Sequence, residues 1–282
     1  MIKVLSAFHI TIQDLGRFAY RSMGVPISGV MDSYSAILAN LILNNKENDA
    51  VLEITFGACQ LQFESDCTIC LTGANFSAKI DGEFVNLNTA ITIKKNAILS
   101  FGKRIYGVRT YLSITEGFQT DSMLGSRSMY KGITPNSIIK KGTVLPIILD
   151  QKTRTKSYSS VKINPTNFNA EFIACYEGPE FYLLAEKQKK QLLDTLFTIS
   201  SDNGRMGYKL EEPITNNFAS MLTSAVLPGT VQITPSGKLI VLMKDCQATG
   251  GYPRVLQITE NAINQLAQKT TGDQFRFKTV AY

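Results

Sequence analysis

Short apolar runs separated by turn residues are the feature of this chain that most limits what it can fold into. Some runs alternate apolar and polar residues, and others are continuously apolar over a few positions, as in Leu239–Met243 and Tyr111–Thr115. Turn sequences punctuate them, including Asp81-Gly82, Glu116-Gly117 and Ser236-Gly237. The pattern predicts a mainly β protein with a few helices.

Three segments have the spacing of helices. Residues 33–43 place apolar side chains on one face, and Asp32 or Ser33 can cap this helix at its start. Residues 183–197 have helical spacing with an exposed Lys-rich face. A short third helix is predicted to begin at Thr259 or Glu260.

The length of 282 residues suits one large domain or two modest ones. Hydrophobic residues make up 44% and charged residues 18%, which is enough apolar material for a packed core. The polar stretch after residue 150 is the best candidate for a linker. We therefore expect an N-terminal lobe at residues 1–150, a linker at 151–169 and a C-terminal lobe at 170–282.

Charge and cysteine usage exclude several classes of protein. The net charge of +6 is spread along the chain, and its densest basic stretches, Lys152–Lys162 and Lys187–Lys190, are typical of solvated faces, so no nucleic-acid partner is expected. No stretch has the length of a membrane span, and the N-terminal residues lack a signal-peptide pattern. The five cysteines form no disulfide framework. We expect a cytoplasmic protein without a membrane partner.

The inventory of reactive residues is narrow. The chain has one histidine, His9, and no G-x-S-x-G motif, which argues against a Ser-His-Asp site. Cys67 and Cys70 lie on a predicted strand, where residues three apart face opposite sides, so no metal site is predicted. No G-x-x-x-x-G-K-[ST] loop is present. Carboxylates, arginines, amides and backbone N–H groups remain, and these can bind a small carboxylate or stabilise an oxyanion.

Motifs along nearly the whole chain carry a resemblance to a known family. The most informative is the strand–turn–strand–glycine-loop segment Pro228–Arg254, which ends in Gln-Ala-Thr-Gly-Gly-Tyr-Pro-Arg. The other matching segments are Thr11–Arg17, Gly24–Asp32, Ala39-Asn40, Leu52–Thr55, Leu71–Ala74, Gly125–Ser128 and Asn203–Gly207. In this order the chain resembles the biotin-dependent carboxyltransferase family, also called allophanate hydrolase subunit 2. It is most like the members that form the C subunit of bacterial 5-oxoprolinase, and it is similar to part of the urea amidolyase carboxyltransferase region.

The resemblance implies two cyclophilin-like β-barrel lobes and a subunit of an ATP-dependent 5-oxoprolinase. Such a subunit would act on a small anionic amide or lactam together with a sister subunit, which is allophanate hydrolase subunit 1-like or the B subunit of 5-oxoprolinase, and a larger catalytic subunit. ATP would be used by the complex, and this chain alone would be inactive. No covalently attached biotin is expected, because Met243-Lys244 follows a strand instead of occupying the hairpin tip of a carrier domain.

Two other functions stay open. One is a carboxyltransferase-type subunit that acts on urea-like or allophanate-like amides. The other is a non-catalytic protein-binding partner that antagonises a sensor-kinase inhibitor. The chain departs from the family in several places. One is that members usually carry Gly-Gly and then Gly-Arg after the Arg127-Ser128 pair, and that second arginine is absent from Met129–Ser137.

The resemblance and the residue chemistry together select the candidate site residues. Planar guanidinium groups can bind a carboxylate or phosphoryl group, and amide donors can hold an amide oxygen. The predicted catalytic residues are Arg127, Arg205, Arg254 and Gln247. The predicted substrate-binding residues are Gln13, Asp14, Arg17, Ser28, Gly29, Asn203, Thr249, Gly250, Gly251 and Tyr252.

Each cluster also has a structural interpretation. Asp14 and Arg17 can form a local ion pair that closes a turn, and Asp32 can serve only as a helix cap while Ser28 and Gly29 form a tight turn. The glycine loop before Arg254 can simply tie the second lobe together. The sequence leaves these alternatives open.

Overall fold

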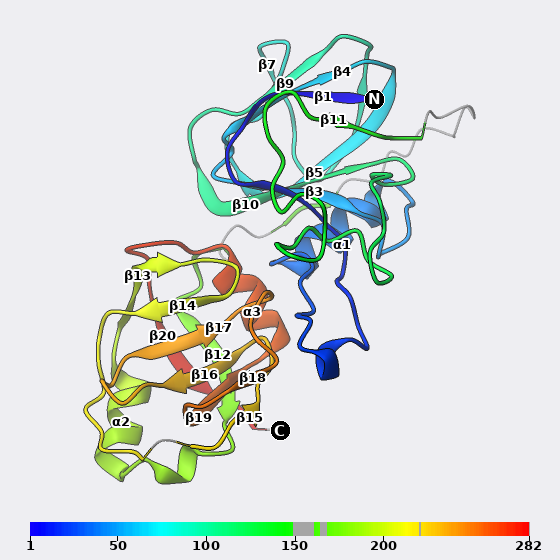
Figure 1. Ribbon diagram of the computed structural model, residues 1–282. Coiled ribbons are helices and arrows are strands. Elements are labelled where there is room, and N and C mark those ends of the chain that lie inside the picture. Colours follow the sequence, from blue (N-terminus) through cyan, green and yellow to red (C-terminus); the bar gives the residue numbers. More distant parts are fainter. Residues whose placement is uncertain (149–160, 164–167, 220, 282) are drawn as a thin grey trace. The chain divides into compact units, whose positions relative to one another are not determined.

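The computed structural model describes residues 1–148, 161–163, 168–219 and 221–281, and it divides into two units. The first unit comprises Met1–Arg17 and Ser28–Phe168, and the second comprises Phe18–Ile27 and Asn169–Tyr282 (Figure 1). The predicted linker, residues 151–169, lies mostly outside the described residues.

One segment of the predicted N-terminal lobe, residues 1–150, belongs to the second unit. This segment is Phe18–Ile27, which contains the short 3₁₀ turn η1 (Arg21–Met23). Its Arg21 side chain donates hydrogen bonds to backbone carbonyls of Val226 and Gln247 in the second unit. Contacts between residues so far apart in the sequence leave no signal in local composition. The predicted division at residues 150 and 169 therefore puts Phe18–Ile27 in the wrong unit.

The strands of the first unit form two sheets. The six-stranded sheet has the order β11-β1-β4-β9-β6-β7, and the five-stranded sheet has the order β2-β3-β10-β5-β8. The strands are β1 (Ile2–Ala7), β2 (Ile10–Gln13), β3 (Val51–Thr55), β4 (Cys59–Phe63), β5 (Cys67–Asn75), β6 (Lys79–Ile80), β7 (Glu83–Phe84), β8 (Ala90–Ile93), β9 (Ile98–Ser100), β10 (Tyr106–Ile114) and β11 (Val144–Leu145).

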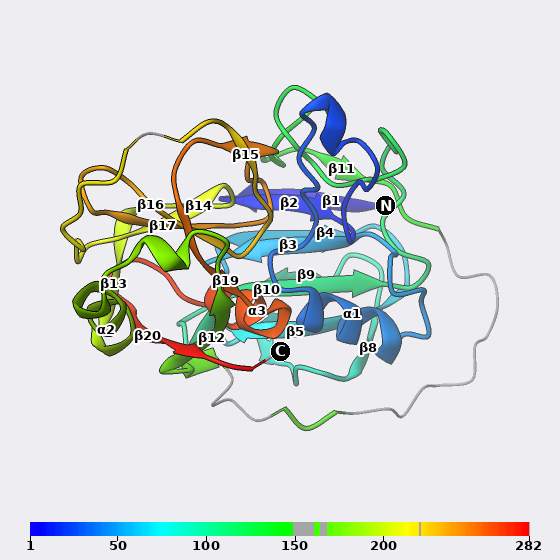
Figure 2. The same cartoon turned by 90° about the horizontal axis from the view of Figure 1, so that it is seen from below.

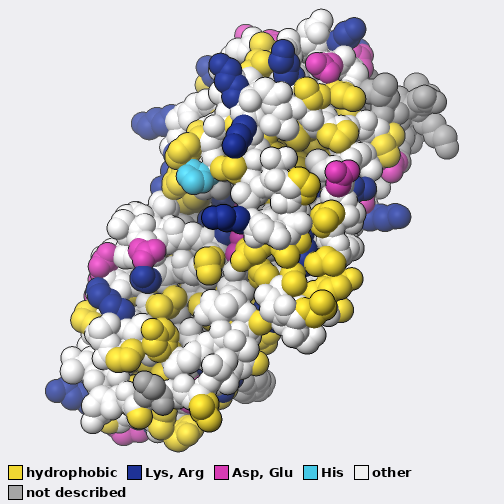
Figure 3. Space-filling view, viewed as in Figure 1, with side chains coloured by type: hydrophobic (Ala, Val, Ile, Leu, Met, Phe, Trp, Pro, Cys, Tyr) yellow, Lys and Arg dark blue, Asp and Glu magenta, His cyan; other side chains and the backbone are white. Residues whose placement is uncertain are grey.

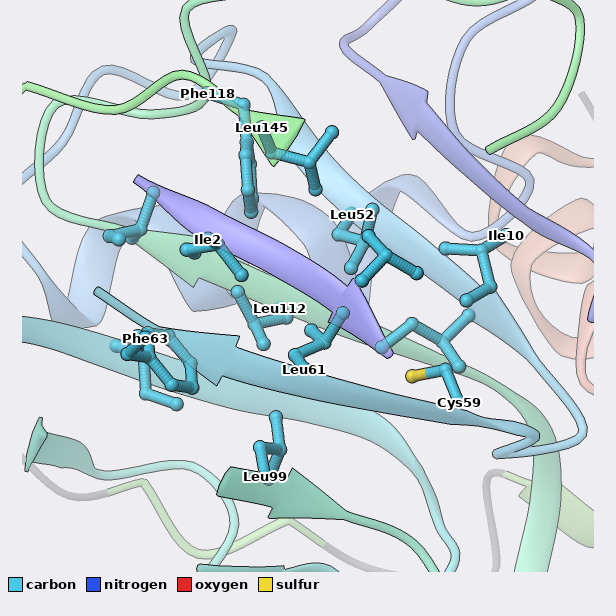
Figure 4. Packing of buried hydrophobic residues seen from close by; sticks show 14 of the residues in the cluster. Ile2, Ile10, Leu52, Cys59, Leu61, Phe63, Leu99, Leu112, Phe118 and Leu145 are labelled. Atoms are coloured by element: carbon cyan, nitrogen blue, oxygen red, sulfur yellow. The ribbon is translucent and has the colours of Figure 1, made fainter. Parts of the chain in front are cut away.

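One hydrophobic core is shared by both sheets of the first unit. Ile2 and Leu61 from the six-stranded sheet pack with Leu52 and Leu112 from the five-stranded sheet, and all four are fully buried (Figure 4). Each such side chain contributes about 1.5–3 kcal/mol by leaving water. Because side chains alternate along a strand, this core dictates that the intervening residues of β3 and β10 lie on the opposite face of their sheet.

That opposite face carries a row of polar residues. Thr11, Glu53, Tyr111 and Thr72 are register partners across β2, β3, β10 and β5. Helix α1 (Ser33–Ile42) packs against β5 and β10 on this side and covers part of the row (Figure 2). The row and α1 together place polar groups beside the candidate site residues of the first unit.

The Asp32→Ala variant is expected to lose about 1–2 kcal/mol of unfolding free energy. The Asp32 carboxylate caps α1 by accepting hydrogen bonds from Ser35 N at 3.0 Å and Ser35 Oγ at 2.6 Å. Alanine leaves both donors without this acceptor in a buried place. Urea unfolding measures the change, and Asp32→Asn, which keeps one acceptor oxygen, should lose less. Equal stability of the alanine variant and the parent chain would contradict the capping role.

The second unit contains a closed barrel of seven strands in the order β12-β19-β16-β17-β14-β13-β20. Its interior is filled by aromatic and branched side chains, including Phe197, Tyr208, Phe275 and Phe277. A separate two-stranded ribbon pairs β15 with β18. The strands are β12 (Phe172–Glu177), β13 (Phe197–Asn203), β14 (Gly207–Leu210), β15 (Ser224–Ala225), β16 (Thr230–Ile233), β17 (Leu239–Leu242), β18 (Thr249–Gly250), β19 (Arg254–Ile258) and β20 (Gln274–Thr279).

The prediction of a mainly β fold with a few helices is confirmed. Besides α1, the described residues include α2 (Glu186–Asp194), α3 (Glu260–Ala267) and the 3₁₀ turn η3 (Phe181–Leu183). Thr259 caps α3, as its sequence position predicted. The second predicted helix is shorter than expected at both ends, because α2 begins at Glu186, after η3, and ends at Asp194, before the chain enters β13 at Phe197.

The surface shows how the charges are distributed. Lys and Arg side chains are scattered among Asp and Glu, and the single histidine, His9, is exposed (Figure 3). Cys67 and Cys70 belong to different buried clusters on opposite faces of their sheet, as the strand spacing predicted. Among the described residues, no helix combines the length and apolarity needed to cross a membrane.

Candidate functional site

The Asp14 carboxylate is the centre of a buried polar cluster in the first unit. Its Oδ1 accepts hydrogen bonds from Gly16 N at 2.8 Å and from the hydroxyls of Ser126 and Ser128, each at 2.6 Å. Its Oδ2 accepts one from Arg127 N at 2.6 Å. Asp14 is 5% exposed, and both serines are buried. The carboxylate therefore fixes the loop that carries Arg127 to the end of β2.

The neighbouring candidate residues join the same cluster. Gln13 donates from Nε2 to the carbonyl of Met129 at 3.3 Å, and the buried guanidinium of Arg17 donates to the carbonyl of Ser128. Gly29 packs directly on the Leu15–Gly16 backbone, where an added Cβ would lie 2.8 Å from the Leu15 carbonyl. Three separate sequence motifs thus meet at one place, as a site requires.

Two side-chain atoms beside this cluster have no hydrogen-bond partner among the described residues. These are Ser28 Oγ and Gln13 Oε1, and both residues are fully buried. Ser28 also has φ 59°, a left-handed conformation that non-glycine residues rarely adopt. Buried polar atoms without a partner cost free energy, and backbone strain is concentrated at functional sites.

The Arg127 side chain is the most available cation among the predicted catalytic residues. It is partly exposed, and it donates from Nη2 to the Gln119 amide oxygen at 3.3 Å. Within the described residues it forms no ion pair with a carboxylate. The Asp14 carboxylate holds the Arg127 backbone, and the guanidinium donates to a neutral amide instead of a carboxylate. An arginine held in this way is suited to binding an anion.

A second buried network, which the sequence reasoning missed, lies under the start of α1. The Tyr111 hydroxyl donates to Glu53 Oε2 at 2.9 Å and accepts from Asp32 N at 2.8 Å. Glu53 Oε2 also accepts from Met31 N, and Arg109 lies 4.0 Å from Oε1. Burial raises the pKa of Tyr111, and the charges of Glu53 and Asp32 raise it further. The tyrosine therefore stays a neutral hydrogen-bonding link between β10, β3 and α1.

The Arg254 guanidinium in the second unit forms a two-pronged pair with Glu180. Arg254 Nε and Nη2 donate to the two carboxylate oxygens at 2.8 and 2.6 Å, and its backbone N–H donates at 2.9 Å. Its remaining Nη1 donates to the carbonyl of Ala225 at 2.8 Å. These hydrogen bonds from Arg254 lower the pKa of Glu180 and raise that of Arg254. Arg254 therefore organises the backbone around it with a neutralised charge.

Arg205 is paired in a similar way. Its Nε and Nη2 donate to the Asp245 carboxylate at 2.8 and 3.0 Å, and Asp245 N donates to the Arg205 carbonyl at 2.8 Å. The pair fixes the chain where it leaves β17 towards Gln247. Asn203 has a different role in the structure, because its amide donates to the Ser200 carbonyl and to Thr271 Oγ1.

A pocket of about 340 Å³ lies beside Arg254 within the second unit. Residues 247–252, which include the ribbon strand β18, carry four exposed candidate residues: Gln247, Thr249, Gly251 and Tyr252. Gly250 packs on Gln232, whose amide donates to the Tyr252 carbonyl at 3.2 Å. The lining includes Ala225, Leu227, Thr230, Arg254, Leu256 and Gln257. Mostly apolar walls with one paired arginine suit a small polar ligand that loses part of its water shell on binding.

Three structural partners of the candidate residues were not found from sequence: Glu180, Asp245 and Arg21. Arg21 donates to the carbonyls of Val226, Gln247 and Ala248 at the base of the ribbon. Glu180 follows a Gly-Pro pair, and Gly178 fits against the Arg254 carbonyl where a Cβ would lie 2.2 Å away. That Gly-Pro-Glu sequence was the one available signal, since it marks a turn that carries an acid.

Comparison with known proteins shows the family to which the chain belongs. The model of the carboxyltransferase domain, subdomains A and B, matches residues 23–279, and the chain belongs to this family. It is 31% identical to the C subunit of 5-oxoprolinase from Escherichia coli strain K12 over 98% of this chain and 90% of that protein.

Solved structures have the same fold. TTHA0988 superposes with a TM-score of 0.88 at 25% identity, covering 98% of this chain and 55% of that one. Urea amidolyase of K. lactis superposes with a TM-score of 0.85 at 26% identity, covering 99% of this chain. This chain spans about half of the TTHA0988 chain and 19% of the urea amidolyase chain.

Proposed function

We propose that this chain is a subunit of an ATP-dependent 5-oxoprolinase, which opens the lactam of 5-oxoproline to glutamate. The observation that carries the proposal is the 31% identity to the C subunit of the E. coli 5-oxoprolinase, which extends over nearly the full length of both chains. A lactam is a poor electrophile, so its oxygen must be activated before water can attack. The subunit then acts with a sister subunit and a larger catalytic subunit.

The roles of the candidate residues follow from their partners. We assign binding of the substrate carboxylate to Arg127, because its guanidinium donates to the neutral Gln119 amide and pairs with no carboxylate of the described residues. Arg254 and Arg205 are matched by Glu180 and Asp245, so we assign them to holding backbone around the pocket and the ribbon. A separate candidate lies in the second unit, where Gln247 and the ribbon amides of Gly250 and Gly251 can donate hydrogen bonds to an amide oxygen.

The candidate arginines of the second unit do not fit a nucleoside triphosphate. The sequence has no phosphate-binding P-loop, and the guanidinium groups of Arg205 and Arg254 already bind carboxylates. We therefore derive no step through ATP on this chain and assign the nucleotide to another subunit of the complex.

Reconstitution tests the proposed function. The chain is co-purified with the proteins encoded beside it, and ATP hydrolysis is measured with and without 5-oxoproline. The expected result is hydrolysis that depends on 5-oxoproline and on the presence of this chain. If all the proteins are folded and assembled and 5-oxoproline changes nothing, the proposal fails.

The Arg127→Gln variant is expected to raise the KM for 5-oxoproline by about tenfold or more, since a charge-assisted hydrogen bond contributes roughly 1.5–3 kcal/mol. The variant keeps the backbone N–H that Asp14 accepts, so the loop should stay in place. Lys131→Gln, an exposed cation in the same loop, serves as the control and should leave KM unchanged. If Arg127→Gln and Lys131→Gln have the same KM, Arg127 does not bind the substrate.

A second candidate function is carboxyl transfer to urea or a related amide. The superposition on K. lactis urea amidolyase favours it, because nearly the whole of this chain matches a part of that protein. The ribbon amides and Gln247 would then hold the urea oxygen. Urea-dependent turnover by the complex with an added biotin carrier protein, and none with 5-oxoproline, would establish this alternative.

A further inference from the structure

The β15–β18 ribbon is too small to hold its own shape. Its two strands share only two register pairs, Ser224 with Gly250 and Ala225 with Thr249. Isolated two-stranded ribbons are marginal in water even when they are longer. Three of its four exposed candidate residues, Gln247, Gly251 and Tyr252, lie just outside these pairs. Side chains outside the ribbon must therefore fix its position.

Two arginines bind successive carbonyl groups, one in β15 and one directly after it. Arg254 donates to Ala225 O at 2.8 Å, and Arg21 donates to Val226 O. Arg21 also reaches the other strand, since Nη2 lies 3.3 Å from Gln247 O and 3.4 Å from Ala248 O. Arg21 is thus a bridge between both strands of the ribbon at their common end.

The backbone of Arg21 is itself fixed by a tight turn. Met23 N donates to Tyr20 O at 3.0 Å, and Gly24 N donates to Arg21 O at 2.9 Å. Gly24 closes the turn at φ 78°, which glycine adopts without strain. The hydrogen bonds of η1 therefore fix the backbone from which the Arg21 guanidinium extends.

The strand that Arg21 holds is also a wall of the pocket. Ala225 and Leu227 line the pocket, and Val226 lies between them with its side chain buried against Leu242 and Cys246. Fixing the Val226 carbonyl therefore fixes the side chains on either side of it. A shift of this strand would change the width of the pocket beside Arg254.

We propose that Arg21 is a positioning residue that sets the wall of the pocket beside Arg254 and the placement of the Gln247–Tyr252 ribbon. The effect on turnover rests on the proposed function, because it assumes that the small amide substrate enters this pocket. The effect on the ribbon does not rest on it. In this proposal Arg21 acts through the backbone carbonyls to which it donates, instead of binding the substrate itself.

Hydrogen–deuterium exchange on the full chain tests the ribbon directly. In Arg21→Gln, the amides of residues 247–252 are expected to exchange at least about tenfold faster, while amides of the barrel strands β16 and β17 keep the parent rates. Arg276→Gln is the matched control, because Arg276 lies on β20 and pairs with Glu171 instead of the ribbon. Arg21→Lys keeps the charge and one donor direction and should give an intermediate change. Unchanged exchange at residues 247–252 in both Arg21 variants overturns the proposal.

Kinetics of the reconstituted complex separate positioning from a general loss of structure. Arg21→Gln is expected to raise the KM for 5-oxoproline about tenfold with kcat within about twofold of the parent, because a displaced wall weakens binding. Partial unfolding would instead lower the apparent kcat at constant KM. Guanidinium ion added to Arg21→Ala should restore part of the lost affinity, and it should leave Arg276→Ala unaffected.

Each outcome decides something. Faster ribbon exchange with a raised KM supports the proposal, and faster exchange with an unchanged KM overturns the link between the ribbon and the substrate pocket. If the parent complex shows no turnover of 5-oxoproline, the proposed function fails, and the exchange data alone still decide whether Arg21 holds the ribbon.

Discussion

The Asp14→Asn variant is expected to lose about 3 kcal/mol of unfolding free energy, one of the largest single effects in this chain. Asp14 accepts four hydrogen bonds from Gly16 N, Ser126 Oγ, Ser128 Oγ and Arg127 N. An asparagine must turn its NH₂ group towards one set of these donors. In the Oδ2 position the NH₂ group faces the Arg127 N–H, and in the Oδ1 position it faces the Gly16 N–H and the two serine hydroxyls. Either way, donors face donors in a buried place.

Urea unfolding followed by circular dichroism measures this loss. Asp66→Asn is a suitable control in the same unit, since Asp66 is exposed and pairs with the exposed Lys94, and its effect should be much smaller. The Asp14 variant should also raise the KM for 5-oxoproline, because the Arg127 loop loses its anchor. A stable Asp14→Asn protein with parent kinetics would show that the cluster neither supports the fold nor places Arg127.

The Glu180→Gln variant is expected to lose about 2 kcal/mol at neutral pH, because the paired and largely buried Arg254 loses the carboxylate that neutralises it. Glutamine can accept one hydrogen bond from the guanidinium but carries no charge. Arg254 would then be less well held against Ala225 O, and the pocket wall would loosen. A double-mutant cycle with Arg254→Gln isolates the energy of the pair.

The same pair makes stability depend on pH. Hydrogen bonds from Arg254 lower the pKa of Glu180 in the folded protein below the ordinary value of 4.5. A lowered pKa means that the contribution is complete above pH 4.5 and is lost as the pH falls through the folded-state value. Comparison of parent and Glu180→Gln at neutral pH and in the acid range should therefore show their stabilities converging at low pH. A constant difference at all pH values would contradict the ion pair.

Local patterns predicted much of the fold. The caps of α1 and α3 at Asp32 and Thr259 were visible because a capping side chain acts within three residues of its own position. The Glu116-Gly117 turn was visible for the same reason, and both residues have positive φ. The first unit could not be resolved into two sheets this way, since pairings such as that of β1 with β11 join distant segments.

The sequence identified many residues of the candidate clusters but not the partners that bind them. Asp14 and Arg17 were selected from one motif and Arg127 from another, and the structure brings the two motifs together through hydrogen bonds. The carboxylates that pair with Arg254 and Arg205 lie 74 and 40 residues away in the sequence. Sequence spacing cannot reveal such partners. The sequence therefore could not show that carboxylates neutralise the charges of Arg254 and Arg205.

The Phe18–Ile27 segment has a consequence for synthesis of the protein. Arg21 is made 205 residues before its acceptor Val226, a delay on the order of 10–40 s at ordinary rates of translation. Residues 18–27 can therefore complete their hydrogen bonds to the second unit only after Val226 and the segment around Gln247 have been synthesised.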